Sequence, residues 1–397
     1  MSKVTGSLTL ARSLLANPRI ILAKPAVNWF LLQYLRRFTP TQAGDHLVLH
    51  SHLPPVNSRA YSRFINEHLL GRNSGPSHAQ VGLTNVCPHD CEYCYNRDRT
   101  GEVMDTARVL KVIRDLRAMG VFWLGFTGGE PLLRKDLVKI TESAADGCAV
   151  KMFTTGATLT RELAADLQRA GLFSVSVSLD HWRAAEHDRV RRCPGAHQTA
   201  LKAIEMFQEV GGVHVGVSTV VSRDLLEGGQ LEEFLHFLIG LGVQEAWLSE
   251  TKPSVENLWS PALVLNDEER ARLVALQDRY NREGRLTVNY LGHFEGPDHF
   301  GCAAGHKMVY VDAFGNVGPC VFVPLSFGNV RERPVKEIVQ EMRTHFPSER
   351  QCFLDRNCTL LKKHYRGESP FRPETSLEVM KEAQFGPLAT FFALQYR

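Results

Sequence analysis

The chain has 397 residues, of which 44% are hydrophobic and 22% are charged, and its formal net charge is +3. A single α/β barrel takes about 200–250 residues, so we expect one large domain with an extension. Residues 1–44 contain six basic and no acidic side chains, which leaves 40 basic against 43 acidic groups in the remainder. The body of the protein is therefore not expected to bind nucleic acid.

The nine cysteines are an odd number and do not form the framework of a small secreted domain. Charged and polar residues interrupt the apolar runs before the length of about 18 residues that a transmembrane helix needs. A secretory signal is not expected either, because Lys24 and Pro25 fall inside its would-be apolar core. We therefore predict a cytoplasmic protein with reduced thiols.

The N-terminal segment 8–38 is predicted to be helical, with breaks at Pro18 and Pro25. Its second half places five apolar side chains on one face, beside two arginines. These side chains are Phe30, Leu31, Tyr34, Leu35 and Phe38. Such a face either lies in a membrane interface, as a peripheral contact, or docks on the body of the protein. Both interpretations stay open at the level of the sequence.

Predicted strands and helices alternate from residue 79 to residue 250, which indicates parallel βαβ units. The strands are expected at 79–83, 121–127, 149–154, 173–179, 213–221 and 245–249. The helices are expected at 105–119, 136–145, 160–170, 196–210 and 229–241. Residues 39–78 are predicted to form a connector with one short helix at 61–70. In such barrels the chemistry lies at the carboxyl ends of the strands.

Three cysteines stand close together directly after the first predicted strand, in a C-x3-C-x2-C arrangement of Cys87, Cys91 and Cys94. Soft thiolates suit iron-sulfur clusters or zinc. Three thiols leave one iron of a four-iron cluster without a protein ligand, so that this iron can bind a small molecule. Alternatively, the three thiols hold a zinc ion together with a fourth ligand such as His89.

The second predicted strand ends in Gly128, Gly129 and Glu130, which presents backbone amides and one carboxylate at its carboxyl end. The cysteine motif with Tyr93 before its last cysteine, followed by this Gly-Gly-Glu, resembles the radical S-adenosylmethionine (SAM) superfamily. The resemblance implies a 4Fe-4S cluster whose open iron binds the amino and carboxylate groups of SAM. Reduction of the cluster then cleaves the sulfonium and produces a 5′-deoxyadenosyl radical.

The same resemblance implies roles for individual residues. Glu130, with the backbone of Gly128 and Gly129, is expected to bind the SAM ammonium. Arg191 ends a stretch that resembles the "HDRxR" sequence of many radical SAM enzymes, and its planar fork suits the SAM carboxylate.

The ribose and the adenine of SAM have their own expected partners. Ser178 and Asp180, at the end of the fourth predicted strand, are expected to hydrogen-bond the ribose with help from Thr155. Tyr93 and Ser218 are expected near the adenine.

A second group of cysteines lies in the C-terminal third. Cys302, Gly315 and Cys320 follow a C-x12-G-x4-C spacing around a predicted β-hairpin, and Cys352 and Cys358 follow further on. This arrangement resembles the SPASM and twitch extensions of radical SAM enzymes, which bind auxiliary iron-sulfur clusters. The resemblance implies that these four cysteines are metal ligands.

The extension departs from the complete SPASM pattern, which continues as C-x2-C-x5-C-x3-C. Glu349 and Lys362 occupy two of its cysteine positions, so the four remaining thiols suffice for one auxiliary cluster. We therefore expect a twitch-like extension. The sulfatase-maturing branch has an acid after the second hairpin cysteine, where this chain has Val321, and this argues against that activity.

The predicted fold is α/β: a partial (β/α)6 TIM-like barrel with a small C-terminal α+β cluster-binding extension and an N-terminal amphipathic helical segment. Five segments are expected. They are the N-terminal helical segment and connector (1–78), the barrel (79–250), a linker and helix (251–299), the auxiliary cluster domain (300–360) and a C-terminal tail (361–397).

We predict an enzyme that cleaves SAM reductively and abstracts a hydrogen atom from an unactivated carbon of a hydrophobic or membrane-proximal substrate, such as a lipid. A flavodoxin- or ferredoxin-like protein would supply the electron. The alternatives are maturation of a ribosomally made peptide, modification of a cofactor or tetrapyrrole precursor, or a non-enzymatic zinc-binding adaptor. Side chains considered as a substrate acid or base are Glu250, His293, His299, His306 and Asp312.

Overall fold

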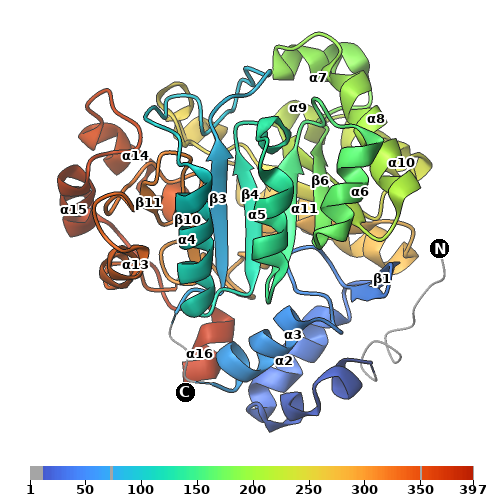
Figure 1. The fold of residues 1–397 in the computed structure, drawn as a ribbon, viewed down its shortest axis with the longest axis horizontal. Coiled ribbons are helices and arrows are strands. Elements are labelled where there is room, and N and C mark those ends of the chain that lie inside the picture. The colour runs from blue at the N-terminus through green and yellow to red at the C-terminus, as the bar shows by residue number, and fades with distance from the viewer. Residues whose placement is uncertain (1–11, 72–74, 349–350, 397) are drawn as a thin grey trace.

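A nine-stranded sheet organises the molecule, in the order β11-β10-β3-β4-β5-β6-β7-β8-β9 (Figure 1). The computed structural model describes residues 12–71, 75–348 and 351–396. Neighbouring strands from β10 to β9 run parallel, and β11 runs antiparallel to β10. The sheet is open, which confirms the predicted α/β fold with an incomplete barrel.

All six predicted strands are present, to within two residues at each end. They are β3 (His78–Thr84), β4 (Trp123–Gly128), β5 (Ala149–Thr154), β6 (Leu172–Ser178), β7 (His214–Val221) and β8 (Glu245–Glu250). Most of their residues are buried on both faces of the sheet, which explains their near-continuous apolar sequences.

The predicted helices between the strands are confirmed as well. They are α4 (Thr106–Ala118), α5 (Leu137–Ala145), α6 (Arg161–Arg169), α8 (Ala196–Val210) and α10 (Gln230–Gly240). Local capping explains where two of them begin: the side chain of Asp105 accepts the Arg108 amide over 2.8 Å, and that of Thr160 accepts the Leu163 amide over 3.2 Å. The short helices α7 (Ala184–Arg191) and α9 (Arg223–Leu226) were not predicted.

Two parallel strands flank the six predicted ones. β9 (Thr287–Tyr290) follows α11 (Asp267–Glu283) inside the expected linker and pairs with β8. β10 (Met308–Val311) and β11 (Val317–Gly318) form the predicted hairpin, but β10 also pairs with β3. A buried ion pair between Arg99 and Asp312, 3.1 Å long, ties the hairpin to the loop that follows the cysteines.

The N-terminal region forms a separate layer at the amino ends of the strands. Its elements are η1 (Pro18–Leu22), α2 (Pro25–Leu35), β1 (Thr41–Ala43), β2 (His46–Val48), α3 (Arg59–Arg63) and the π-helix η2 (Phe64–Leu69). Pro18 and Pro25 each begin a helical segment, as the predicted breaks require. Residues 8–11 of the predicted helix lie outside the described residues.

The apolar face of α2 packs on the body of the protein. Leu31, Tyr34 and Phe38 are buried, and the Tyr34 ring lies 5.2 Å from the ring of Phe300 in an edge-to-face arrangement. Of the two interpretations left open by the sequence, docking is therefore the one that the structure shows for this face, and a peripheral membrane contact of the N-terminal segment stays a prediction. Some aromatic partners of this face, such as Phe294 and Phe300, come from segments more than 240 residues away, which a local sequence pattern does not reveal.

The C-terminal part contains further helices around the hairpin. They are η4 (Glu256–Leu258), η5 (Pro261–Leu263), α12 (Leu291–Phe294), α13 (Val335–Arg343), α14 (Phe353–His364), α15 (Pro373–Glu382) and α16 (Thr390–Tyr396). One further short helix, η3 (Pro131–Leu133), follows the Gly pair at the end of β4. In Figure 1, α16 lies beside α2 and α3 at the end of the molecule away from the strand tips. Within the described ranges, no helix is long and apolar enough to span a membrane.

Candidate functional site

The three cysteines after β3 line one cavity at the carboxyl end of the sheet. Cys87, Cys91 and Cys94 share this cavity, whose volume is about 160 Å³. The amides of Asp90 and Glu92 donate to carbonyl oxygens of α7 over 3.2 and 3.1 Å. These hydrogen bonds hold the cysteine loop against α7.

Burial raises the pKa of all three thiols in this cavity. It raises the pKa of Cys87 to about 12, and it also raises the pKa values of Cys91 and Cys94. Since thiolates are the ligands of metals, assembly of a cluster here releases protons.

Gly128 and Gly129 bring the end of β4 against the stem of the cysteine loop. A Cβ atom at Gly128 would lie 2.4 Å from the carbonyl oxygen of Thr84, and one at Gly129 would lie 2.3 Å from that of Val86. Gly128 also has a φ of +110°, which L side chains rarely adopt. Both glycines line the cavity, so this close approach places their backbone beside the cysteines.

Glu130 lies outside the wall of this cavity. Its carboxylate is fully buried and accepts hydrogen bonds from Leu132 N over 3.0 Å and from Thr154 Oγ1, Thr155 N and Thr155 Oγ1 over 2.6 Å each. The residue therefore ties the ends of β4 and β5 together. Contact between this carboxylate and the SAM ammonium stays a prediction.

Asp180 joins Arg191 and Tyr93 behind the cavity. Arg191 Nε donates to Asp180 Oδ2 over 2.7 Å, the Tyr93 hydroxyl donates to the same oxygen, and Val220 N donates to Oδ1 over 3.0 Å. Burial alone would raise the pKa of Asp180, but the Arg191 charge, together with His187 and the hydrogen bonds from Tyr93 and Val220, lowers the pKa overall. Arg191 and Tyr93 line the cavity, whereas Asp180 does not.

Three hydroxyl side chains that the sequence predicted near SAM also line this cavity. Thr155 follows β5, Ser178 ends β6 and Ser218 lies on β7, and all three line the cavity. Around the first cysteine group, the structure thus brings together every predicted site residue except Glu130 and Asp180. Their contacts with SAM stay predictions.

Sequence reasoning missed Trp247 and Lys252 in the wall of this cavity, whereas Glu250 was considered as a substrate acid or base. Trp247, Glu250 and Lys252 come from β8 and the loop after it, and they line the same cavity. Lys252 Nζ donates to Asp355 over 2.9 Å, and Arg270 pairs with both Asp355 and Glu250, over 2.8 and 3.0 Å. Glu250 is thus held in ion pairs. The available signal was the position of Lys252, just beyond the carboxyl end of a barrel strand.

Three cysteines of the extension share a second, smaller cavity. Cys302, Cys320 and Cys352 line this space of about 50 Å³, which shares Trp247 and Lys252 with the first cavity. A hydrogen bond with Cys352, together with burial, raises the pKa of Cys302. The two thiol groups therefore face a common region of the molecule.

Glu295 and Cys358 differ from the predicted ligand set. Glu295 lines the second cavity, and burial raises its pKa to about 7. Sequence reasoning missed it because it lies in the expected linker. Cys358 does not line that cavity; it is buried in α14, where Asp355 and Lys362 are the charges that act on it. Coordination by Cys358 stays a prediction.

Both thiol groups fit iron-sulfur clusters in their donor chemistry. Each gathers three soft thiol ligands around one cavity, and the first borders a wall of hydroxyls, backbone and one arginine that suits a polar nucleotide. In the part of the chain that the structure describes, no three acidic, histidine or cysteine side chains already surround one metal position.

Comparison with protein families decides between cluster and zinc. The family model "Radical SAM superfamily" matches residues 81–238, and the model of the SPASM iron-sulfur cluster-binding domain matches residues 302–359. The chain belongs to the radical SAM superfamily. It is therefore an enzyme that uses a 4Fe-4S cluster with SAM and carries an auxiliary iron-sulfur cluster, and the zinc-binding adaptor is rejected.

Curated relatives of this radical SAM enzyme have several activities. An AdoMet-dependent heme synthase of Methanosarcina barkeri is 27% identical over 68% of this chain and 84% of that protein. A PqqA peptide cyclase of Bradyrhizobium diazoefficiens is 29% identical over 60% of this chain and 64% of that protein. The mycofactocin maturase MftC of Mycolicibacterium smegmatis is 29% identical over 60% of this chain and 63% of that protein.

Solved structures share the fold. Streptococcus suis SuiB bound to its precursor peptide SuiA matches with a TM-score of 0.58 at 16% identity, over 76% of each chain. The structure of anSMEcpe with AdoMet and a peptide matches with a TM-score of 0.54 at 16% identity, over 68% of this chain and 82% of that one. At this identity the likeness concerns the fold alone.

Proposed function

We propose that this radical SAM enzyme cleaves SAM reductively at the first cysteine group and abstracts a hydrogen atom from an unactivated carbon of its substrate. When bound, the cluster would supply the electron that breaks the sulfonium bond. The observation that carries the proposal is one cavity lined by Cys87, Cys91, Cys94, the Gly pair and Arg191.

The chain's own residues have distinct tasks in this proposal. Arg191 binds the SAM carboxylate through its donor fork, and Asp180 holds that fork and the Tyr93 ring in place. Because the Glu130 carboxylate is buried and fully hydrogen-bonded, the carbonyl oxygens of the Gly pair are better placed to accept the SAM ammonium. Glu130 then acts as a positioning residue.

The substrate carbon lies between the two thiol groups. Trp247 and Lys252 border both cavities, so a molecule bound there faces the SAM site on one side and Cys302, Cys320 and Cys352 on the other. Trp247, Val321 and Phe322 line both cavities and shield this region from water, which protects a reactive radical from side reactions. Electrons would come from a flavodoxin- or ferredoxin-like donor.

Three substrate classes have separate support. A hydrophobic or membrane-proximal substrate is favoured by the apolar side chains exposed at the N-terminal end of the molecule. Maturation of a ribosomal peptide is favoured by two relatives, the PqqA cyclase and MftC, and a tetrapyrrole by the heme synthase. Incubation with SAM, reductant and each class in turn distinguishes them, because only the true substrate becomes coupled to SAM cleavage.

SAM cleavage tests the proposal directly. Anaerobically reconstituted enzyme given a strong reductant should form 5′-deoxyadenosine. Cys91→Ala should abolish this product and lower the bound iron, because the cluster loses one of its three ligands. Cys148→Ala is the matched control, since Cys148 is buried away from both cavities and its thiol donates to Val121 O over 3.2 Å. Wild-type enzyme that binds iron but forms no 5′-deoxyadenosine would contradict the proposal.

A further inference from the structure

A third cavity lies at the end of the molecule opposite the cysteine loop. Its volume is about 150 Å³, and α2, α3, η2 and the C-terminal segment contribute its walls. His78 and Phe122, which also line it, stand at the amino ends of β3 and β4. Figure 1 shows α2, α3 and α16 together at this end. The cavity is therefore separate from the SAM site, and its occupant does not contact the cysteines.

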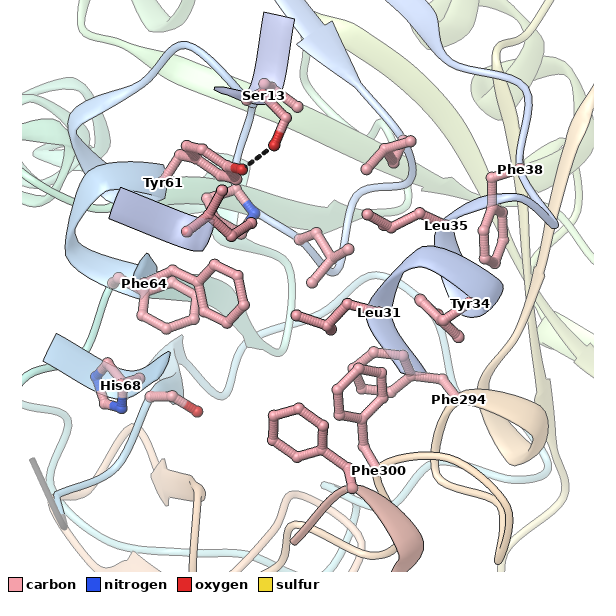
Figure 2. Close-up of a pocket in the computed structure, with 18 of the residues that line it drawn as sticks. Ser13, Leu31, Tyr34, Leu35, Phe38, Tyr61, Phe64, His68, Phe294 and Phe300 are labelled. Carbon is pink, nitrogen blue, oxygen red and sulfur yellow. Dashed lines mark hydrogen bonds between the residues drawn. The ribbon is translucent and has the colours of Figure 1, made fainter. Parts of the chain in front are cut away.

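Most of the surface that lines this cavity is apolar, although His68, His78 and Lys307 also reach it. Figure 2 shows Leu31 and Leu35 of α2 directed across it toward Tyr61 and Phe64. The Tyr61 hydroxyl is hydrogen-bonded to Ser13 and needs no further partner. An engineered cavity of similar size and lining, about 150 Å³, stays dry and takes apolar molecules. The chemistry thus suits a hydrocarbon chain, which forms no hydrogen bonds.

Apolar side chains are also exposed to solvent next to η1, which contributes to the cavity. Ile20 of η1 lines the cavity, whereas its neighbours Ile21 and Leu22 are 66% and 69% exposed. Leu15 and Trp29 continue this exposed patch on either side in the sequence, at 83% and 61%. Exposed apolar side chains mark interaction surfaces, and Ile21 and Leu22 follow a residue that lines the cavity.

The N-terminal segment at this end is basic. Residues 12–44 contain no acidic side chain. Arg36 lines the cavity, is exposed, and its guanidinium makes no hydrogen bond or ion pair with any described residue. The adjacent Arg37, by contrast, pairs with Asp278 over 3.1 Å. An unpaired guanidinium at the mouth of an apolar cavity fits an anionic headgroup attached to a hydrocarbon chain.

We propose that this cavity binds a segment of one hydrocarbon chain of an anionic membrane lipid. The lipid phosphate contacts Arg36, and Leu15, Ile21, Leu22 and Trp29 enter the membrane interface. This contact uses the surface opposite the buried face of α2. Lipid binding itself does not depend on the proposed function. Its role does: the lipid would hold the enzyme at the membrane, where a hydrophobic substrate is found.

Two binding measurements test the cavity and its mouth. cis-Parinaric acid, a fluorescent anionic fatty acid, should bind wild-type protein. Leu35→Trp should weaken this binding at least about tenfold, because filling the space displaces about two buried methylene groups. Arg36→Gln should weaken it as well, and should also reduce flotation with phosphatidylglycerol vesicles. Arg37→Gln, which removes the same charge from the next residue, should change neither measurement.

The outcomes distinguish lipid binding from the proposed SAM cleavage. All variants should form 5′-deoxyadenosine at the wild-type rate, because their side chains are remote from the SAM site; this also shows that they are folded. Should Leu35→Trp fail to fold, the exposed pair Arg36→Gln and Arg37→Gln still decides the question. No parinaric acid binding by wild-type protein, or equal effects of the two arginine variants, overturns the proposal. Flotation with phosphatidylcholine vesicles equal to that with phosphatidylglycerol also overturns it.

Discussion

At Gly129, the end of β4 lies so close to the carbonyl oxygen of Val86 that no side chain fits between them. The neighbouring Gly128 has the same relation to Thr84, and together they let the sheet approach the stem of the cysteine loop. Glu130 adds four accepted hydrogen bonds beneath this contact. The positions of the three thiols thus depend on residues that are themselves not ligands.

Gly129→Ala should displace the cysteine loop, because its Cβ would lie 2.3 Å from Val86 O. We expect a loss of stability of about 1–3 kcal/mol, as overpacking usually costs, and a clear loss of iron from the first site. Gly240→Ala is the matched control, since a Cβ there meets no atom within 4 Å and the residue is helical. Iron analysis and denaturant unfolding measure both variants; wild-type iron content in Gly129→Ala would contradict this account.

The hairpin β10–β11 and helix α14 decide how the auxiliary thiols meet. β10 extends the main sheet beside β3, which carries Cys302 and Cys320 to the side of the barrel mouth. Cys352 precedes α14 and reaches the same cavity, whereas Cys358 is buried within the helix. Cys352 and Cys358 are close in sequence but have different surroundings, because Cys352 precedes the first turn of α14 and Cys358 lies inside the helix.

Cys320→Ser should lower the auxiliary iron content strongly, whereas Cys358→Ser should lower it much less, because only Cys320 lines the second cavity. Iron and sulfide analysis should be carried out in a Cys91→Ala background, which removes iron at the first site. Equal losses in the two variants would show that α14 rearranges when the cluster binds and that Cys358 is a ligand.

Buried histidines make the stability of the whole molecule depend on pH. Burial lowers the pKa values of His50, His68, His187 and His214 to about 4. In the unfolded chain their pKa is about 6.5. Between these two values the unfolded state binds more protons than the folded state, so the free energy of unfolding falls as the pH decreases below about 6.5.

Each such histidine should make the protein about 1 kcal/mol less stable at about pH 5.5 than at about pH 7.5. His68→Gln retains a donor toward Gly120 O, which His68 Nε2 contacts over 2.8 Å. The variant should therefore lower the difference in unfolding free energy between the two pH values by about 1 kcal/mol. Anaerobic denaturant unfolding at the two pH values measures it. An unchanged difference between wild-type and variant would show that His68 does not titrate in this way.

The six β/α units, the hairpin and both cysteine groups follow from the sequence by itself, because strand periodicity, turn residues and thiol spacing are local properties. Only the tertiary structure decided that α2 buries its aromatic face, that Glu130 lies outside the cavity wall, and that Lys252 and Glu295 belong to the two cavities. Each of these depends on which distant segments pack together. The apolar cavity at the amino ends of the strands has the same origin, since residues from both ends of the chain line it.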